Sequence, residues 1–268
     1  MSNHSARTDS RLGLLDGARG EFLTAQLLSV VASRVATSRS KSDLVGQFLA
    51  RLLAAAETND AERRAAILTD IRSNGVAVED IVDTLIPEAA KVLGEDWEVD
   101  NRSFAEVTMI IARLQLMLRD LAAEWRSDLA EGSAGLRMML ALPSSEQHTL
   151  GALIAASQFR RLGVSVRVVL GQSDEAVIEQ VQTREFDLIA FSIYSSEKIE
   201  SVRRIVRALR AGSRTLPLII LGGPLADTRS DLKLLTGVDY VTSKPEEAIR
   251  LCTTGRHPVQ TGSEKVRV

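Results

Sequence analysis

The chain is poor in the residues that build disulfides, protein metal clusters and stacking platforms. Its 268 residues include one cysteine, Cys252, and three histidines. A single cysteine excludes a disulfide within the chain, as is typical of a reducing cytoplasm, and it excludes a cysteine-based metal cluster. At 4% aromatic residues, the chain also lacks the rings on which proteins stack single-stranded nucleic acid.

Long apolar runs and a strong net charge are missing too. No run approaches the roughly 18 apolar residues of a transmembrane helix. The first twenty residues hold no apolar stretch of the signal-peptide kind. The net charge is −2, so no overall attraction to nucleic acid or to a membrane surface is expected. We therefore expect a cytoplasmic protein without a membrane partner.

What is present is a globular composition, 45% hydrophobic and 25% charged. Residues 1–20 are polar and predict a flexible tail. Residues 21–126 carry apolar residues at three- and four-residue spacing, which predicts a bundle of four or five helices. Asp60 and Asn74-Gly75 indicate the start and end of one helix, and Pro87 predicts a kink or a break in another. Residues 127–135 are polar and predict a linker.

The pattern of apolar residues is different in the second half of the chain. Short apolar runs rich in β-branched residues alternate with helical stretches, and the runs cover 136–143, 165–170, 187–194, 217–223 and 239–243. This alternation predicts right-handed βαβ units and a parallel sheet with helices on both faces. The predicted fold is α/β: an N-terminal all-α bundle, then a flavodoxin-like five-stranded parallel sheet at 136–254, then a tail at 255–268.

Ligands of open parallel sheets bind beyond the carboxyl ends of the strands. The candidate site residues there are Ser145, Glu146, Gln147, His148, Thr149, Leu150 and Gly151 after the first strand, Ser192, Ile193, Tyr194 and Ser195 at the third, Gly222, Gly223 and Pro224 at the fourth, and Thr242 at the fifth. The paired glycines either let the backbone approach a bulky ligand or simply form a strand-to-loop turn.

His148 has three interpretations. It is a solvated loop residue, or a general base acting with nearby serines, or a ligand to a metal. No Gly-x-Ser-x-Gly elbow supports the second. The third requires a metal already held by its own macrocycle, since protein co-ligands of suitable spacing are missing. Glu146 could then accept a hydrogen bond from the other ring nitrogen, an arrangement that fixes the tautomer of a ligating histidine.

Taken together, these residues resemble the cobalamin-binding domains that bind their cofactor base-off, with histidine on the cobalt. The pattern of that family is Asp-x-His-x-x-Gly, then Ser-x-Leu after about forty residues, then Gly-Gly after slightly under thirty more. Here Glu146-x-His148-x-x-Gly151 is followed by Ser192-x-Tyr194 and by Gly222-Gly223 at the same spacing. Glu146 in place of Asp and Tyr194 in place of Leu are departures from it.

The helical half is similar to the bundle that caps the corrin in that family, where a Trp precedes a Glu-His pair. Trp97 precedes Glu106-Val107 here, one residue too close and without the histidine. Val107 can therefore neither coordinate nor protonate anything on the upper face. Trp97 is either a cap residue or simply a core residue of the bundle.

The combination is most similar to the AerR/PpaA family of cobalamin-dependent antirepressors of photosynthesis genes. The resemblance implies a light-responsive regulator with adenosylcobalamin or hydroxocobalamin as cofactor and His148 as the lower cobalt ligand. It places the nucleotide tail of the cofactor between the first and fourth strands, and it implies a redox-sensing repressor of the CrtJ/PpsR type as partner. It does not imply an enzyme.

Two other functions stay open. A corrinoid methyl carrier or enzyme subunit would use the same His148 loop, although such proteins keep the Glu-His pair. A flavodoxin-like domain without a cofactor would have no use for the spaced motifs. Direct sequence-specific DNA binding by the chain alone is not expected, because no helix-turn-helix precedes the bundle and the basic stretch at 203–210 suits a solvated helix face.

Overall fold

The computed structural model describes residues 43, 45–123, 125, 135–144, 146–212 and 216–254. The predicted tails, residues 21–42 of the predicted bundle and residues 127–134 of the predicted linker lie outside these residues, as does Ser145. The described residues belong to two compact units, which divide between Glu98 and Val99. The predicted boundaries at 126 and 136 stay predictions.

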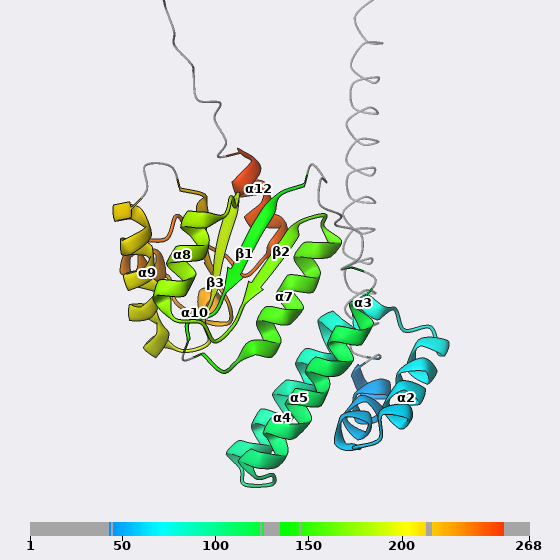
Figure 1. Cartoon of the computed structure of the whole chain (residues 1–268). Coiled ribbons are helices and arrows are strands. Elements are labelled where there is room, and N and C mark those ends of the chain that lie inside the picture. The colour runs from blue at the N-terminus through cyan, green and yellow to red at the C-terminus, as the bar shows by residue number, and fades with distance from the viewer. Residues whose placement is uncertain are drawn as a thin grey trace, which may run out of the picture. The chain divides into compact units, whose positions relative to one another are not determined.

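The first unit is helical (Figure 1). Residues 45–57 form a helix, which is followed by α2 (Ala61–Ser73), α3 (Val78–Asp80), the π-helix η1 (Ile81–Leu85) and α4 (Ile86–Glu98). The Asp60 carboxylate accepts hydrogen bonds from the N–H groups of Glu62 and Arg63, at 2.9 and 3.1 Å. Asn74 and Gly75, the latter at φ 85°, follow the last turn of α2. Both predicted helix signals are confirmed.

Pro87 does not break its helix. The chain stays helical from Val78 to Glu98, but the turn just before Pro87 is a π-helix in which the N–H of Ile86 bonds to the carbonyl of Ile81. Proline has no N–H to donate and its ring crowds the carbonyl four residues earlier. A π turn is one of the known ways in which a helix absorbs such a local irregularity.

The second unit begins with α5 (Phe104–Leu121) and continues as an alternation of strands and helices (Figure 1). Its elements are β1 (Arg137–Ala141), α7 (Thr149–Arg161), β2 (Ser165–Val169), α8 (Asp174–Thr183), β3 (Leu188–Ser192), the 3₁₀ turn η2 (Ser196–Lys198), α9 (Ile199–Gly212), β4 (Leu218–Gly222), α10 (Leu225–Thr228), α11 (Leu232–Thr236), β5 (Tyr240–Val241) and α12 (Pro245–Thr254). The strands are parallel, in the order β2-β1-β3-β4-β5. That is the flavodoxin-like order, so the predicted fold class is confirmed.

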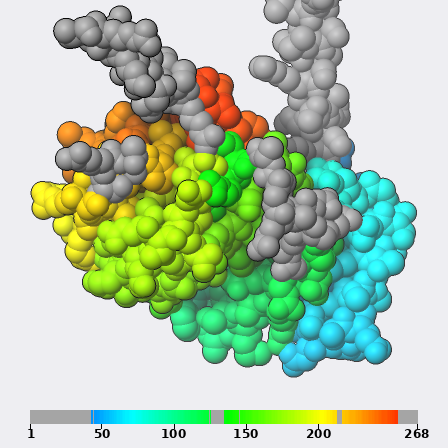
Figure 2. Space-filling view, turned by 45° about the horizontal axis from the view of Figure 1, so that its top comes forward, coloured from blue at the N-terminus to red at the C-terminus, as the bar shows by residue number. Residues whose placement is uncertain are grey.

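Side chains of β1, β3 and β4 alternate between two separate cores. Met138 and Leu140 of β1 pack with α7 and α12, whereas Met139 and Ala141 pack with α8, α9 and α11. A strand buried on both faces reads as a continuous apolar run, which is why the sequence shows runs instead of alternation. Figure 2 shows the yellow-green and yellow surfaces of α8 and α9 side by side on one of these faces.

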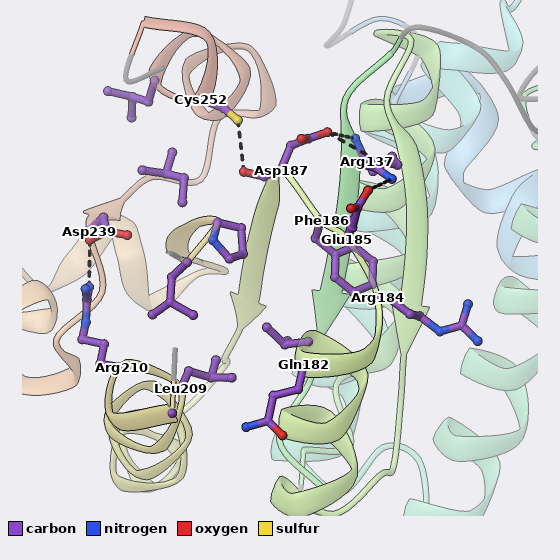
Figure 3. Close-up of a pocket in the computed structure, with 16 residues that line it drawn as sticks. Arg137, Gln182, Arg184, Glu185, Phe186, Asp187, Leu209, Arg210, Asp239 and Cys252 are labelled. Carbon is purple, nitrogen blue, oxygen red and sulfur yellow. Dashed lines mark hydrogen bonds and ion pairs between the residues drawn. The ribbon is translucent and has the colours of Figure 1, made fainter. Parts of the chain in front are cut away.

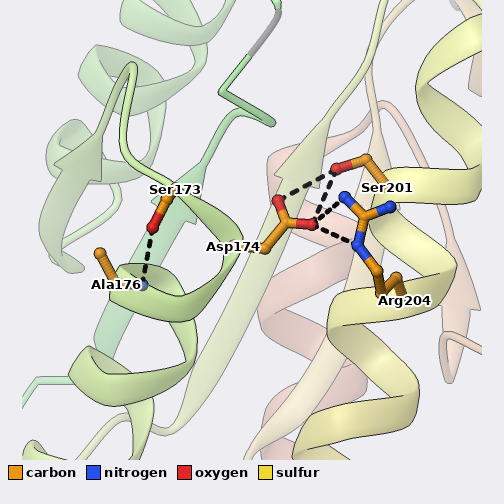
Figure 4. A network of polar contacts seen from close by, with 5 residues as sticks. All are labelled: Ser173, Asp174, Ala176, Ser201 and Arg204. Atoms are coloured by element: carbon orange, nitrogen blue, oxygen red, sulfur yellow. Dashed lines mark hydrogen bonds and ion pairs between the residues drawn. The ribbon is translucent and has the colours of Figure 1, made fainter.

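A polar cluster ties α8 to α9 (Figure 4). Asp174, 7% exposed, accepts hydrogen bonds from the Ser201 hydroxyl at 3.1 Å and from Arg204 Nε at 2.8 Å. A buried carboxylate needs such partners. The cluster therefore fixes the start of α9, and with it the segment that follows β3.

Candidate functional site

The loop between β1 and α7 presents Glu146 and His148 at the carboxyl edge of the sheet. The N–H of Glu146 donates to the carbonyl of Pro143 at 2.8 Å, which folds the loop back on itself. The side chain of Glu146 is 2% exposed, whereas that of His148 is 59% exposed. A buried acid thus lies beneath an accessible imidazole.

The carboxylate of Glu146 makes three contacts, two with His148 and one with the backbone just after β3. Its carboxylate accepts from the backbone N–H of His148 at 3.0 Å, contacts His148 Nδ1 at 2.7 Å, and accepts from the N–H of Tyr194 at 3.1 Å. Burial raises the pKa of Glu146, but the hydrogen bonds from His148 and Tyr194 outweigh burial, and the net pKa is lowered. An ionised carboxylate only accepts, so Nδ1 carries a proton, and in the neutral imidazole Nε2 is then the nitrogen with the lone pair.

Tyr194 covers one face of the same imidazole. The two ring centroids lie 3.9 Å apart and the ring planes differ by 16°. Tyr194 comes just after β3, which pairs with β1, and it is 52% exposed. The sequence pointed to this position as a strand-end site residue and as a departure from Ser-x-Leu, but it did not reveal the stack.

The neighbouring backbone at the edge of the sheet leaves little room for a Cβ at either of the paired glycines. Gly223 has φ 98°, and a Cβ there would collide with the carbonyl oxygen of Ile193. A Cβ on Gly222 would lie 3.1 Å from the carbonyl oxygen of Thr242. The strand-turn interpretation is thus sufficient for both. Gly151 differs, because a Cβ there would meet open space, which leaves room above the first turn of α7.

The remaining edge residues have varied surroundings. Ile193 is buried and Ser192, which pairs with Gly222 across β3 and β4, is half-buried. The Thr242 hydroxyl donates to Glu247 at 2.7 Å and accepts from the N–H of Lys244 at 3.1 Å, so it shapes the start of α12. The other predicted residues of this edge are half-buried at Thr149 and Ser195, buried at Leu150, and exposed at Gln147 and Pro224.

The expected path of a nucleotide tail between the first and fourth strands would pass over the end of β3, and it stays a prediction. β3 lies between β1 and β4, so these two strands do not neighbour each other. Ser192 and Gly222 instead face each other across the ends of β3 and β4. A ligand contacting both would lie over that pair of strands.

Three residues were predicted to cap the upper face of the corrin, and each has its own surroundings in the structure. Glu106 forms a capping box at the start of α5: its carboxylate accepts from the N–H and the hydroxyl of Ser103, at 2.8 and 2.7 Å. Ser-x-x-Glu before an apolar run is the sequence signature of that motif. Val107 is half-buried, and Trp97, on α4 of the other unit, is 49% exposed and so is not a core residue there. Their proximity to a corrin stays a prediction.

One contact that the sequence did not reveal ties the histidine loop to α5. Gln115 Nε2 donates to the hydroxyl of Thr149 at 2.8 Å, and Thr149 directly follows His148. A glutamine on the half-buried side of an amphipathic helix was the available signal. The start of α7 is therefore anchored to the helix that carries Glu106.

The donor set suits a metal that arrives with most of its coordination complete. Within the described part of the chain, no group of three or more His, Cys, Asp or Glu side chains could hold a metal ion. Nε2 of His148 is a single nitrogen donor, backed by a buried carboxylate as ligating histidines usually are. These residues fit one axial position of a macrocyclic metal.

A cavity of about 1280 Å³ lies at the opposite, amino-terminal edge of the sheet (Figure 3). Four of the charged side chains around it form two ion pairs, Arg137 with Glu185 at 3.0 Å and Arg210 with Asp239 at 2.8 Å. Cys252 donates from Sγ to the carbonyl of Asp187 at 3.4 Å. These contacts hold strand starts together, far from the histidine loop along β1.

Comparison with known proteins decides which family the second unit represents. The family model described as the B12 binding domain matches residues 136–251. An uncharacterized 20.5 kDa protein from the bchF-crtJ intergenic region of Rhodobacter capsulatus is 33% identical over 177 residues, which cover 66% of this chain and 92% of that protein. The chain belongs to the B12-binding domain family. Cobalamin is the cofactor of this domain, as predicted.

One solved structure shows the same fold. The monomethylamine corrinoid protein of Methanosarcina barkeri matches with a TM-score of 0.60 at 13% identity, over 80% of this chain and 96% of that one. A cobalamin-binding protein from Desulfitobacterium hafniense matches more loosely, with a TM-score of 0.41 at 16% identity over 78% and 98%. Within the described residues of the B12-binding chain, no helix is long and apolar enough to cross a bilayer.

Proposed function

We propose that the chain is a light-responsive transcriptional regulator that binds cobalamin through His148 and acts as an antirepressor through a protein partner. The observation that carries the ligation is the Glu146–His148 pair, which leaves Nε2 as the accessible donor of a half-exposed ring. The proposed partner is a redox-sensing repressor of the CrtJ/PpsR type. The chain is proposed to be neither an enzyme nor a sequence-specific DNA-binding protein by itself.

When bound, an alkylcobalamin such as adenosylcobalamin supplies a light-labile cobalt–carbon bond, which hydroxocobalamin lacks. Glu146 retains the proton on Nδ1, and His148 would then offer Nε2 to the cobalt. Thr149, bonded to Gln115, connects this loop to α5. A change in the position of His148 would thus act directly on a long helix of the same unit.

Two observations support regulation through a protein. The name of the Rhodobacter capsulatus relative places it beside crtJ, and the proposed partner is a repressor of the CrtJ type. The basic stretch of α9 is largely neutralised, since Arg203, Arg204 and Arg210 pair with Glu200, Asp174 and Asp239 respectively. Paired guanidinium groups are poor candidates for contacts to DNA phosphates.

A corrinoid methyl carrier is the alternative. The likeness to the monomethylamine corrinoid protein favours it at the level of fold. Val107 disfavours it, because the capping bundle of that family has a histidine directly after its glutamate, and here Val107 follows Glu106.

The first experiment tests ligation. Absorption spectra of the purified chain titrated with hydroxocobalamin are expected to show base-off binding with histidine coordination, and His148→Ala should abolish it. Gln182→Ala, at an exposed residue of the opposite edge of the sheet, is the control and should bind normally. An unchanged spectrum and affinity in His148→Ala would refute ligation by this residue.

The second experiment tests regulation. The affinity of the adenosylcobalamin-loaded chain for a purified CrtJ/PpsR-type repressor is measured in the dark and after illumination. We expect affinity to differ between the two conditions in the wild-type chain and to be the same in His148→Ala. Cobalamin binding with equal affinity for the repressor in both conditions would instead favour the carrier function.

A further inference from the structure

The stack of Tyr194 on His148 limits the tilt of the imidazole ring, which the carboxylate of Glu146 leaves free. A hydrogen bond at Nδ1 holds one edge of the imidazole but leaves the ring free to tilt about that contact. The Tyr194 ring, 3.9 Å away and within 16° of parallel, fixes the tilt. Nε2 lies on the edge that neither contact occupies, because stacking covers a face and not an edge of the ring.

Tyr194 also supports the acid that holds the histidine. Its backbone N–H donates to one oxygen of Glu146 at 3.1 Å, while the other oxygen contacts His148 Nδ1 at 2.7 Å. Tyr194, just after β3, therefore positions both members of the pair. Its backbone holds the carboxylate of Glu146, and its side chain holds the imidazole of His148.

The Tyr194 ring has little other role in the fold. It is 52% exposed and so fills no core position, and its contact with His148 is the ring contact that the structure shows for it. A side-chain substitution leaves the backbone bond to Glu146 in place. The stack can thus be removed with little effect on folding.

We infer that Tyr194 is a positioning residue for cobalt ligation, which orients the imidazole of His148 before the cofactor arrives. The inference rests on the proposed role of His148. A ring already held in its bound orientation loses less side-chain freedom on binding, so affinity rises without a new contact to the ligand. Removing the stack should weaken hydroxocobalamin binding about two- to tenfold, the range to which a typical aromatic pair corresponds.

The first measurement needs no cofactor. The chain has three histidines, and the ring signals of His148 in a proton–carbon NMR spectrum are those lost in His148→Ala. Nuclei above the face of an aromatic ring are shielded, so these signals should lie upfield in the wild-type chain. Tyr194→Phe should retain the shift, and Tyr194→Leu, which restores the residue of the family pattern, should move them downfield.

The second measurement is a hydroxocobalamin titration of the same variants. Tyr194→Phe should bind as the wild-type chain does, and Tyr194→Leu should bind about two- to tenfold more weakly. Tyr240→Leu is the matched control, the same change at a 41% exposed tyrosine on β5, and should alter neither the His148 signals nor the affinity.

The outcomes separate this inference from the function on which it rests. If His148→Ala binds with an unchanged spectrum, ligation by His148 fails and the inference fails with it. If His148→Ala abolishes binding while Tyr194→Leu shifts no ring signal or binds with unchanged affinity, the positioning role alone is overturned. A shift and a weakening that Phe rescues and Tyr240→Leu does not reproduce would establish it.

Discussion

Replacing Glu146 with Gln isolates the contribution of the buried carboxylate. The two side chains have nearly the same shape, but the carboxamide has one acceptor oxygen and one donor group. All three contacts of Glu146 come from N–H donors on His148 and Tyr194. Whichever way the amide is turned, its NH₂ group therefore faces at least one donor.

The better orientation keeps the oxygen toward His148, which retains two contacts and sets the amide against the N–H of Tyr194. One buried hydrogen bond is then lost at a cost of about 1–3 kcal/mol, partly offset because the neutral side chain is easier to bury. We expect Glu146→Gln to unfold in urea with a free energy lower by about 1–2 kcal/mol. A neutral oxygen also holds the Nδ1 proton less firmly.

The substitution should also weaken cofactor binding. Mutation of the residue behind a ligating histidine typically weakens metal binding about 10- to 100-fold. We expect that range for the dissociation constant of hydroxocobalamin, measured by absorbance titration. Glu197→Gln, the same change at an exposed glutamate of η2, is the control and should leave the constant unchanged. Binding by Glu146→Gln within about twofold of wild type would refute the carboxylate's role, since the weakening expected for a mutated histidine partner begins at about tenfold.

Two further predictions concern the elements around the site. Gly223→Ala places a Cβ at φ 98° against the carbonyl of Ile193, just after β3, and should lower the free energy of unfolding by about 2 kcal/mol or more; an unchanged urea midpoint would contradict this. Hydrogen bonds from Ser103 lower the pKa of Glu106, so this glutamate stabilises the fold above its unfolded pKa and the contribution is lost as pH falls through the folded pKa. Ser103→Ala should raise the pKa of Glu106 in an NMR titration, and a pKa that stays where it was would show that the cap does not set it.

The fold could be predicted because its signals are local. Strands buried on both faces give apolar runs, and Asp60 and Gly75 delimit a helix through contacts within a few residues. The kink or break predicted at Pro87 has a local cause as well. Proline predicts the irregularity, but nothing in the sequence chooses between a break and a π turn, since packing of the buried residues on either side decides that.

The site was predictable only in part, for a different reason. Strand ends of a parallel sheet meet at one edge, so His148 and Ser192 could be grouped from topology alone. Contacts within that edge depend on side-chain length and rotamer. The stack of Tyr194 and the bond from Gln115 to Thr149 join residues 46 and 34 positions apart in the chain, and no spacing rule specifies such pairs.

The two departures from the family pattern, Glu146 and Tyr194, lie on the same imidazole. The extra methylene of Glu146 lengthens its reach, and its carboxylate extends from His148 in the β1 loop to the backbone after β3. The aromatic ring of Tyr194 then covers the face of the histidine that the acid does not touch. Because both residues act on one ring, their substitutions should not be additive. Each departure taken alone looks like a weakened motif, but together they hold the ligand from its edge and from its face.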